Sequence, residues 1–207
     1  ADPQRTNIQP GPALVGTPQL VAHSPISGDS MVLAGNRLIV TNYNSVAALD
    51  PRTLDVLWQT NPGNGVYTSP LIAGDVIYLG YSLVTESISD DPANNQLVAM
   101  SLKDGSILWR ANGAGGAGNE MAVQGQTIYA VGGTGTSVIL GAYRTDDGSP
   151  IWTAPIDGAI RCCGGLHVVL GDGLAYVAFR YHVSAFDLKD GRLIWTATVT
   201  SDIYFGS

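Results

Sequence analysis

The strongest constraint on the fold of this chain is a tryptophan that recurs along its length. The chain has 207 residues and four tryptophans. Each tryptophan follows a short turn, and the separations between them are 51, 43 and 43 residues. A repeat of about 40 to 50 residues is typical of an array of equivalent structural units. The four positions are Trp58, Trp109, Trp152 and Trp195.

Each unit contains the pattern of two β-hairpins. In the second unit, residues 96–102 lead into the turn Lys103-Asp104-Gly105 and then into the segment that ends at Trp109. The fourth unit repeats this pattern with Lys189-Asp190-Gly191. Asp-Gly between two apolar segments predicts a hairpin, because glycine adopts positive φ without steric cost. A second hairpin precedes each of these. Four short strands per unit, without a 3.6-residue period, predict an all-β fold built from propeller blades.

The repeat also predicts where the blades begin and end. Residues 1–29 are rich in proline and are expected to be mostly irregular. Residues 199–207 are expected to begin a further blade. An incomplete blade would leave an open sheet edge and an uncovered apolar face. We therefore expect the chain to be part of a larger propeller, or to associate with a second copy that completes one. The four expected blades span about 30–61, 66–111, 119–155 and 162–198.

Residues 69–109 resemble a known family. The run from Ser69 to Tyr78, then Leu97-Val98-Ala99-Met100, and then residues 104–109 look like the PQQ-like repeat. The resemblance covers about residues 30–207. It implies a PQQ-like β-propeller of seven or eight blades, in which the four repeated tryptophans are structural and dock onto the neighbouring blade. The repeat occurs in quinoprotein alcohol dehydrogenases and in the non-catalytic lipoprotein of the outer-membrane assembly machine, so it leaves the function open.

The most distinctive residues are the adjacent pair Cys162-Cys163, which are the only cysteines of the chain. Adjacent cysteines can form a disulfide only in a strained ring, and such a bond is unusually easy to reduce. The resemblance to quinoprotein alcohol dehydrogenases implies a vicinal disulfide over the PQQ ring. Those enzymes follow the pair with Asn-Arg-Gly, where this chain has Leu166-His167. The alternative is that both cysteines are packing residues or form a structural disulfide.

A quinoprotein also needs a calcium ion, which prefers carboxylate and amide oxygens. Asn119 and Glu120 are the best candidate pair, because they fall at the expected start of an inner strand. The alternative is an ordinary turn. Asp90-Asp91 is a second candidate, with a solvated acidic loop as its alternative. The spacing of His23, His167 and His182 does not match a zinc site.

Charge and hydropathy restrict the partners and the location. Ten basic and 17 acidic residues give a net charge of −7, which disfavours nucleic acid and anionic membranes as partners. No uncharged stretch is apolar enough for a membrane span. The opening residues are compatible with a mature terminus, so we expect a secreted or periplasmic protein. The longer second unit, with its extra residues between Tyr81 and Leu97, places a candidate partner-binding loop there.

Two functions fit these observations. The first is a non-catalytic PQQ-like propeller that binds a protein or a small molecule through its loops or central face, with no cofactor. The second is a portion of a PQQ-dependent quinoprotein alcohol dehydrogenase, with PQQ and Ca²⁺ as cofactors. The first rests on the blade pattern without a recognisable catalytic set. The second rests on Cys162-Cys163.

Overall fold

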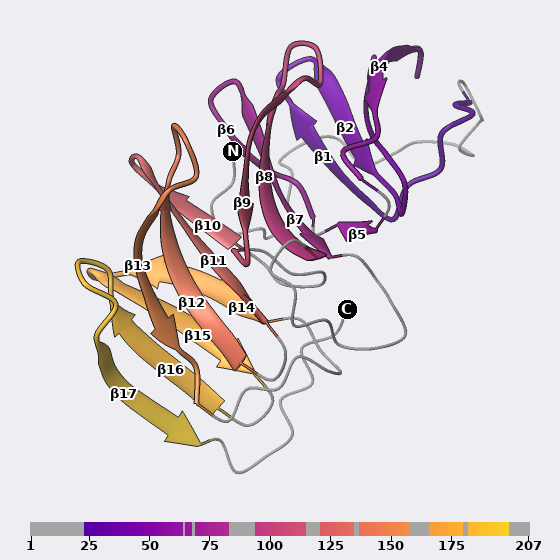
Figure 1. Cartoon of the computed structure of the whole chain (residues 1–207). Helices are drawn as coiled ribbons and strands as arrows, with labels where there is room; N and C mark the ends of the chain where they lie inside the picture. The colour runs from indigo at the N-terminus through magenta and orange to yellow at the C-terminus, as the bar shows by residue number, and fades with distance from the viewer. Residues whose placement is uncertain are drawn as a thin grey trace.

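The computed structural model describes residues 23–63, 65–67, 69–82, 94–114, 121–134, 137–157, 166–179 and 182–198. These residues form four antiparallel sheets, which follow one another along the chain (Figure 1). In each sheet the strands occupy four neighbouring positions in the order of the sequence, and in one sheet two short strands share the first position. The prediction of an all-β fold of four four-stranded blades is therefore confirmed. In the described ranges, no helix is long and apolar enough to cross a membrane.

The strand bounds define the four blades. Blade 1 contains β1 (Ser30–Ala34), β2 (Arg37–Thr41), β3 (Val46–Leu49) and β4 (Val56–Thr60). Blade 2 contains β5 (Val66–Tyr67), β6 (Leu71–Ala73), β7 (Val76–Ser82), β8 (Asn95–Ser101) and β9 (Ile107–Asn112). Blade 3 contains β10 (Met121–Gln124), β11 (Thr127–Thr134), β12 (Ser137–Arg144) and β13 (Pro150–Pro155). Blade 4 contains β14 (His167–Gly171), β15 (Leu174–Phe179), β16 (His182–Asp187) and β17 (Leu193–Thr198).

Blade 2 differs from the others in its first row. Two short strands, β5 and β6, both pair with β7 and together replace the single first strand of the other blades. Pro70 lies between them. Proline has no backbone N–H, so it cannot donate to the ladder and interrupts a strand at that point. The prolyl break therefore explains the fifth strand without changing the four-row blade.

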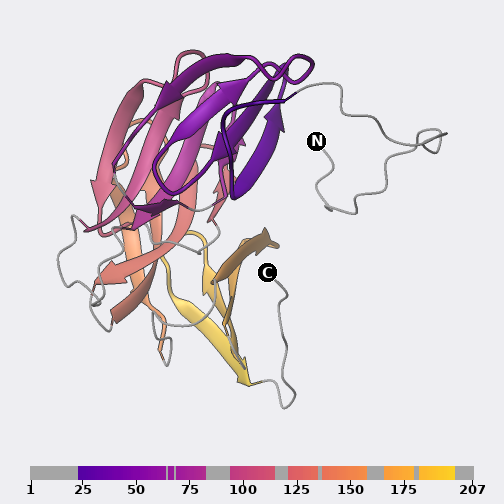
Figure 2. The ribbon, with the colours of Figure 1, turned by 90° about the vertical axis from the view of Figure 1, so that its right-hand side faces the viewer.

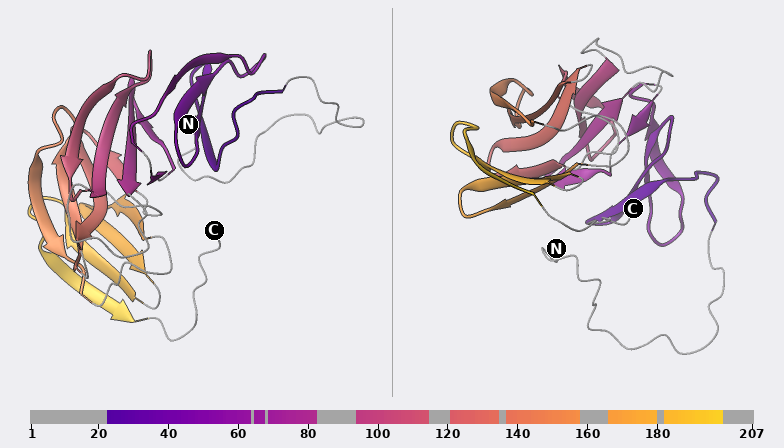
Figure 3. Two further views of the ribbon diagram at one scale, coloured as in Figure 1. Left: turned by 45° about the vertical axis from the view of Figure 1, so that its right-hand side comes forward. Right: turned by 90° about the horizontal axis from the view of Figure 1, so that it is seen from below.

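The blades pack face to face, and two views show them succeeding one another around an arc (Figures 2 and 3). Because side chains alternate along a strand, each blade presents one apolar face to the next blade and the other to the previous one. We call the first the forward face and the second the reverse face. In the first interface, Ile39 and Ala48 of blade 1 share a buried cluster with Ile77 and Met100 of blade 2. Similar clusters fill the next two interfaces.

Three tryptophans contact the next blade in the same way. The indole of Trp109, on the forward face of blade 2, lies against Gly148 in the β12–β13 turn of blade 3. Its Nε1–H donates to the carbonyl oxygen of Thr145 at 3.0 Å. Trp152 makes the equivalent bond to Leu188 at 3.0 Å, and Trp58 makes it to Leu102 at 3.3 Å. Each tryptophan therefore combines an apolar ring contact with one hydrogen bond to the same turn.

The turn glycine is required for two separate reasons. Gly105, Gly148 and Gly191 have φ of 71°, 72° and 74°, a left-handed conformation that side chains other than glycine adopt at a steric cost. A Cβ at any of the three would also come closer than 3.0 Å to the indole on the previous blade, which real Cβ atoms do not do. The Asp-Gly pattern in the sequence thus marks the position where the next blade receives a tryptophan.

Trp195 stands apart from this arrangement. Its ring packs at a tilt against Tyr176 of its own blade with ring centroids 6.0 Å apart, much as Trp109 packs against Tyr78 at 5.9 Å. Its side chain is nevertheless 42% exposed, whereas the other three tryptophans are half-buried. No turn of another blade covers it within the described part of the chain. Within the described residues, three of the four tryptophans therefore contact a neighbouring blade.

The two roles of the turn glycine can be separated by comparing Gly148→Ala with Gly125→Ala. Both glycines have positive φ, but a Cβ on Gly125 would meet nothing within 4 Å. We expect Gly125→Ala to lower the free energy of unfolding by about 1 kcal/mol, from backbone strain alone. Gly148→Ala should cost a further 1–3 kcal/mol or so, because the new methyl overlaps the Trp109 ring. Urea unfolding measures both, and equal losses would contradict the contact.

Trp109→Ala and Trp195→Ala form a second matched pair. Trp109 loses its contact with blade 3 and its hydrogen bond, so we expect a cost of about 3 kcal/mol, the lower end for large aromatic truncations. Trp195→Ala should cost much less, because its ring is exposed and covered only by its own blade. Thermal and urea melts of the two variants test this. Equal losses would mean that the tryptophan ring stabilises its own blade rather than the contact with the next blade.

Candidate functional site

The two ends of the blades differ in their chain connections. One end, here called the turn end, carries the tight hairpins, such as Gly35-Asn36 between β1 and β2 and Asp190-Gly191 between β16 and β17. The other, the connection end, carries the links from one blade to the next and the links between the second and third strands. In Figure 1 the tight turns lie along the upper and left margins. Binding residues are commonly found on such links, which vary without disturbing the sheets.

Acidic residues of the turn end serve the turns themselves. The carboxylate of Asp104 accepts hydrogen bonds from the hydroxyl and the backbone N–H of Ser106, and these bonds lower its pKa. Ser149 lowers the pKa of Asp147 in the same way. In blade 1, the backbone N–H groups of Arg52 and Thr53 lower the pKa of Asp50. These carboxylates are ionised at neutral pH and hold their own turns by hydrogen bonds. The turns at Asp104 and Asp147 each receive a tryptophan of the preceding blade.

The residues predicted to bind a cofactor or metal lie outside the described residues. Cys162-Cys163 precedes β14, and Asn119-Glu120 precedes β10. Asp90-Asp91 and most of the expected partner-binding loop fall between β7 and β8. Strands β10 and β14 are the first strands of neighbouring blades and contact each other directly.

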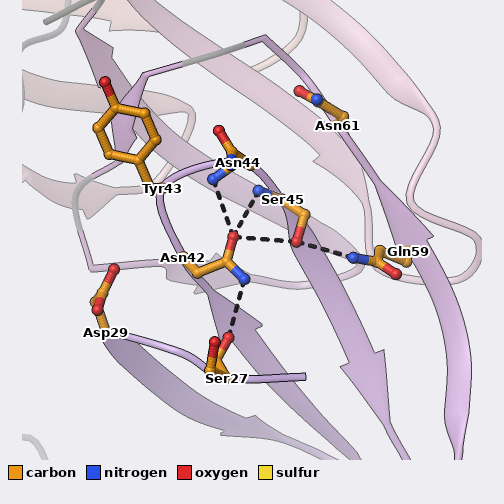
Figure 4. Close-up of a pocket in the computed structure, with 8 residues that line it drawn as sticks. All are labelled: Ser27, Asp29, Asn42, Tyr43, Asn44, Ser45, Gln59 and Asn61. Carbon is orange, nitrogen blue, oxygen red and sulfur yellow. Dashed lines mark hydrogen bonds between the residues drawn. The ribbon is translucent and has the colours of Figure 1, made fainter. Parts of the chain in front are cut away.

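The described residues show one polar cleft at the connection end, on blade 1 (Figure 4). Its volume is about 560 Å³. Asp29 and Tyr43 lie on one side, and Gln59 and Asn61 lie on the other. The Tyr43 side chain is 48% exposed. The lining residues are Ser27, Asp29, Asn42, Tyr43, Asn44, Ser45, Gln59 and Asn61.

The side chain of Asn42 organises this cleft. Its Oδ1 accepts hydrogen bonds from the backbone N–H groups of Asn44 and Ser45 at 2.9 and 2.8 Å. Its Nδ2 donates to the carbonyl oxygen of Ser27 at 2.9 Å. The Ser45 hydroxyl donates to Asn42 Oδ1 and accepts from Gln59 Nε2 at 3.0 Å. Asn42 therefore fixes the β2–β3 turn and links it to the segment before β1.

The chemistry of the cleft is polar but almost uncharged. Amide, hydroxyl and phenol groups surround a single carboxylate, Asp29, and no lysine, arginine or histidine lines the space. Such groups exchange hydrogen bonds with hydroxyl or amide groups of a neutral ligand. They offer no cation to hold a phosphate or carboxylate. This cleft was not predicted from the sequence, although the run Asn42-Tyr43-Asn44-Ser45 between two strands indicates a turn.

A second cavity, of about 510 Å³, lies between blades 2 and 3. Its lining includes Tyr143, Arg110 and the turn at Gly148. Burial raises the pKa of Tyr143 to about 12, so the phenol is neutral at physiological pH. Arg110 donates to the backbone carbonyl of Pro62 and to Gln96 Oε1. This cavity thus borders the contact between Trp109 and blade 3. Its only basic side chain, Arg110, is already hydrogen-bonded to neighbouring residues.

Metal-ligating groups are scattered in the part of the chain that the structure describes. No group of three or more His, Cys, Asp or Glu side chains there comes close enough to hold a metal ion. His23 lies before blade 1, while His167 and His182 lie on β14 and β16. The Nδ1 atom of His182 is 3.4 Å from the Thr198 hydroxyl. The histidines therefore do not form a common site.

The repeat, the four sheets and the tryptophan joints can now be compared with known proteins. A family model described as outer membrane protein assembly factor BamB matches residues 19–161 and 80–204. The chain belongs to the PQQ-like β-propeller family. BamB from Moraxella catarrhalis superposes with a TM-score of 0.59 at 18% identity, over 81% of this chain and 51% of that one. A europium-containing methanol dehydrogenase gives 0.64 at 15% identity, over 83% and 41%.

Sequence relatives of this PQQ-like propeller include enzymes. The dehydrogenase subunit of the quinone alcohol dehydrogenase of Acetobacter aceti is 28% identical over 165 residues, which is 80% of this chain. The corresponding subunit of Gluconobacter oxydans (strain 621H) is 24% identical over 168 residues, or 81% of this chain. The chain spans 18% of the length of each of these two relatives. The similarity therefore supports the propeller repeat but does not show which role this chain has.

Proposed function

We propose that the chain is a non-catalytic PQQ-like propeller module that binds a protein or small molecule at its connection end. The observation that carries this proposal is the polar cleft of blade 1, which opens at that end and is lined by amide, hydroxyl and phenol groups. Several carboxylates of the turn end, including Asp104 and Asp147, already hydrogen-bond to the turns that receive tryptophans. The match to a family described by an assembly factor supports a binding role.

The same comparison supports an extracytoplasmic location for the module. A family described as an outer membrane assembly factor works outside the cytoplasm, and this supports the secreted or periplasmic location expected from the sequence. The net charge of −7 supports a partner other than nucleic acid. We place the partner-facing surface at the connection end, over blade 1 and the neighbouring inter-blade links.

The chemistry of the cleft specifies the ligand group. We propose that it binds a neutral group rich in hydroxyls or amides, because amide and hydroxyl side chains line it without a cation. Tyr43 provides a half-exposed ring against which a sugar ring or a peptide plane can stack. Asp29 would accept a hydrogen bond from the ligand and would repel an anion. The expected preference is therefore neutral over negatively charged.

Saturation-transfer NMR with glucose, N-acetylglucosamine and glucose 6-phosphate tests this preference. We expect millimolar binding of the neutral sugars, which corresponds to about −4 kcal/mol, and at least tenfold weaker binding of the phosphate. Asn44→Ala should weaken the signal about fivefold, because Asn44 lines the cleft. Asn36→Ala, in the β1–β2 turn at the opposite end, is the control and should bind normally. An absence of binding, or equal losses in both variants, would contradict the cleft proposal.

The second candidate is a portion of a PQQ-dependent alcohol dehydrogenase. It is favoured by the similarity to two quinone alcohol dehydrogenase subunits and by Cys162-Cys163. In this case the cysteines and the Asn119-Glu120 pair precede neighbouring first strands, β14 and β10, which contact each other. PQQ would supply the two-electron acceptor and Ca²⁺ would polarise it. The chain would contribute a vicinal disulfide from Cys162 and Cys163 and an amide and a carboxylate from Asn119 and Glu120.

Thiol titration and cofactor addition distinguish the two candidates. If the chain is a binding module, we expect no quinone absorption to remain with the protein after PQQ and Ca²⁺ are added and then dialysed away. The dehydrogenase candidate instead predicts retained quinone absorption and fewer than two free thiols in unreduced protein, since the chain has only two cysteines. Cys163→Ser separates these readouts, because it should abolish retention only if the pair contacts the cofactor. Quinone retained by the wild type and lost in this variant would overturn the non-catalytic proposal.

A further inference from the structure

The reverse face of blade 3 differs from the others at one place. In blades 1, 2 and 4, polar side chains at the third and fourth strands bond to one another across this face. These bonds are Gln59 to Ser45 at 3.0 Å, Arg110 to Gln96 at 3.0 Å and Ser184 to Thr196 at 2.9 Å. In blade 3 the register places Ile139, Gly141 and Thr153 at the equivalent positions. Isoleucine and glycine have no polar side chain, so blade 3 lacks this bond.

The ring of Tyr143 lies in the space that Gly141 leaves. The two residues are two positions apart on β12, and a Cβ on Gly141 would overlap the phenol oxygen of Tyr143. Tyr143 directly follows the β-bulge of its strand. The residues at the same position in the other blades are all apolar: Leu49, Met100 and Phe186. Blade 3 therefore carries a hydroxyl where each of the other three blades has an apolar side chain.

This hydroxyl has no partner among the described residues. Tyr143 is only 4% exposed, although a buried tyrosine usually hydrogen-bonds through its hydroxyl. Within the described ranges, Arg37 Nε is the only unpaired polar side-chain atom that is completely covered. The Tyr143 oxygen is unpaired as well, so it is not completely covered, and it lies at the wall of the cavity between blades 2 and 3. Burial keeps the phenol protonated, so it can donate a hydrogen bond into this space.

The walls of the cavity are mostly apolar. Its volume of about 510 Å³ lies within the range of small-molecule sites. Ile139 and Pro150 of blade 3 and Ala111 of blade 2 contribute apolar surface. Asp147 contributes a carboxylate that Ser149 keeps ionised by lowering its pKa. These groups favour a ligand that is neutral and largely apolar.

We propose that this cavity binds a small neutral molecule with one carbonyl oxygen on an apolar body, and that Tyr143 donates a hydrogen bond to this oxygen. The apolar part would contact the walls around Ile139 and Ala111. An anion would lose hydration there without gaining a free cation, because Arg110 is already bonded to Gln96 and Pro62. The site is separate from the cleft of blade 1, and the proposal does not depend on the ligand of that cleft.

The test compares acetophenone with α-methylstyrene, which has a CH₂ group in place of the carbonyl oxygen. We expect saturation-transfer NMR to give a dissociation constant for acetophenone of about 1 mM or lower, and at least roughly tenfold weaker binding of benzoate. Tyr143→Phe should weaken acetophenone about fivefold and leave α-methylstyrene unchanged, because only the carbonyl accepts from the hydroxyl. Tyr129→Phe, on the opposite face of blade 3, is the control and should bind both probes normally.

A thermal melt separates a binding role of the hydroxyl from a structural one. Phenylalanine stands at the equivalent position of blade 4, so Tyr143→Phe should fold. Its Tm should equal or exceed that of the wild type, because an unpaired buried hydroxyl is removed. Thr153→Gln tests the location, since blade 1 has glutamine at this position. The longer side chain should occupy the cavity and weaken both probes, whereas Asn44→Ala in the cleft of blade 1 should change neither.

Three outcomes would overturn this proposal. The first is no binding of acetophenone to the wild type, because the cavity would then not accept such a ligand. The second is an equal effect of Tyr143→Phe on both probes, or no effect on either, because the hydroxyl would then not recognise the carbonyl. The third is unchanged binding in Thr153→Gln, which would place the ligand elsewhere. Binding of sugars in the cleft of blade 1 is measured separately, so the failure of one site is distinguished from the failure of the other.

Discussion

The fold depends on one repeated contact, the indole of one blade lying on a glycine of the next. A four-stranded sheet with two apolar faces is unstable alone, and it becomes stable when neighbouring blades cover those faces. The contact sets the relative position of two blades, because the ring must lie flat on a residue without a Cβ while Nε1 reaches a carbonyl in the same turn. Small displacements would lose the hydrogen bond or create an overlap. The joint thus supplies both apolar burial and alignment.

This requirement explains why the two ends of the blades differ. Tryptophan stands near the start of the outermost strand, so the residues that receive it must lie at the turn end of the next blade. The turn also needs its own hydrogen bonds, and carboxylates such as Asp104 and Asp147 provide them. The turn end is therefore fixed in length and chemistry. Among the described residues the connection end carries no such joint, and a structural network such as that of Asn42 can form there without disturbing the stack.

The sequence predicts the features that recur and misses those that occur once. Tryptophan spacing and Asp-Gly turns were sufficient to predict four blades, because each signal is repeated and has a simple steric cause. The interruption of the strand at Pro70 could also have been predicted, because proline has no backbone N–H to donate to the neighbouring strand. The blade 1 cleft was not predicted, because it depends on hydrogen bonds between segments that no period relates. The significance of Leu54 could not be predicted from the sequence either, because it depends on how closely an indole approaches the equivalent glycines of the other turns.

The tryptophan joint also gives the array a direction. Each joint has a face that supplies the indole and a turn that receives it. At the corresponding turn of blade 1 the left-handed position is occupied by Leu54, with φ of 62°, in place of glycine. On the reverse face of blade 1, Met31 and Leu33 are 66% and 63% exposed, so this face offers apolar side chains to a neighbour without the glycine that receives an indole in the other three turns.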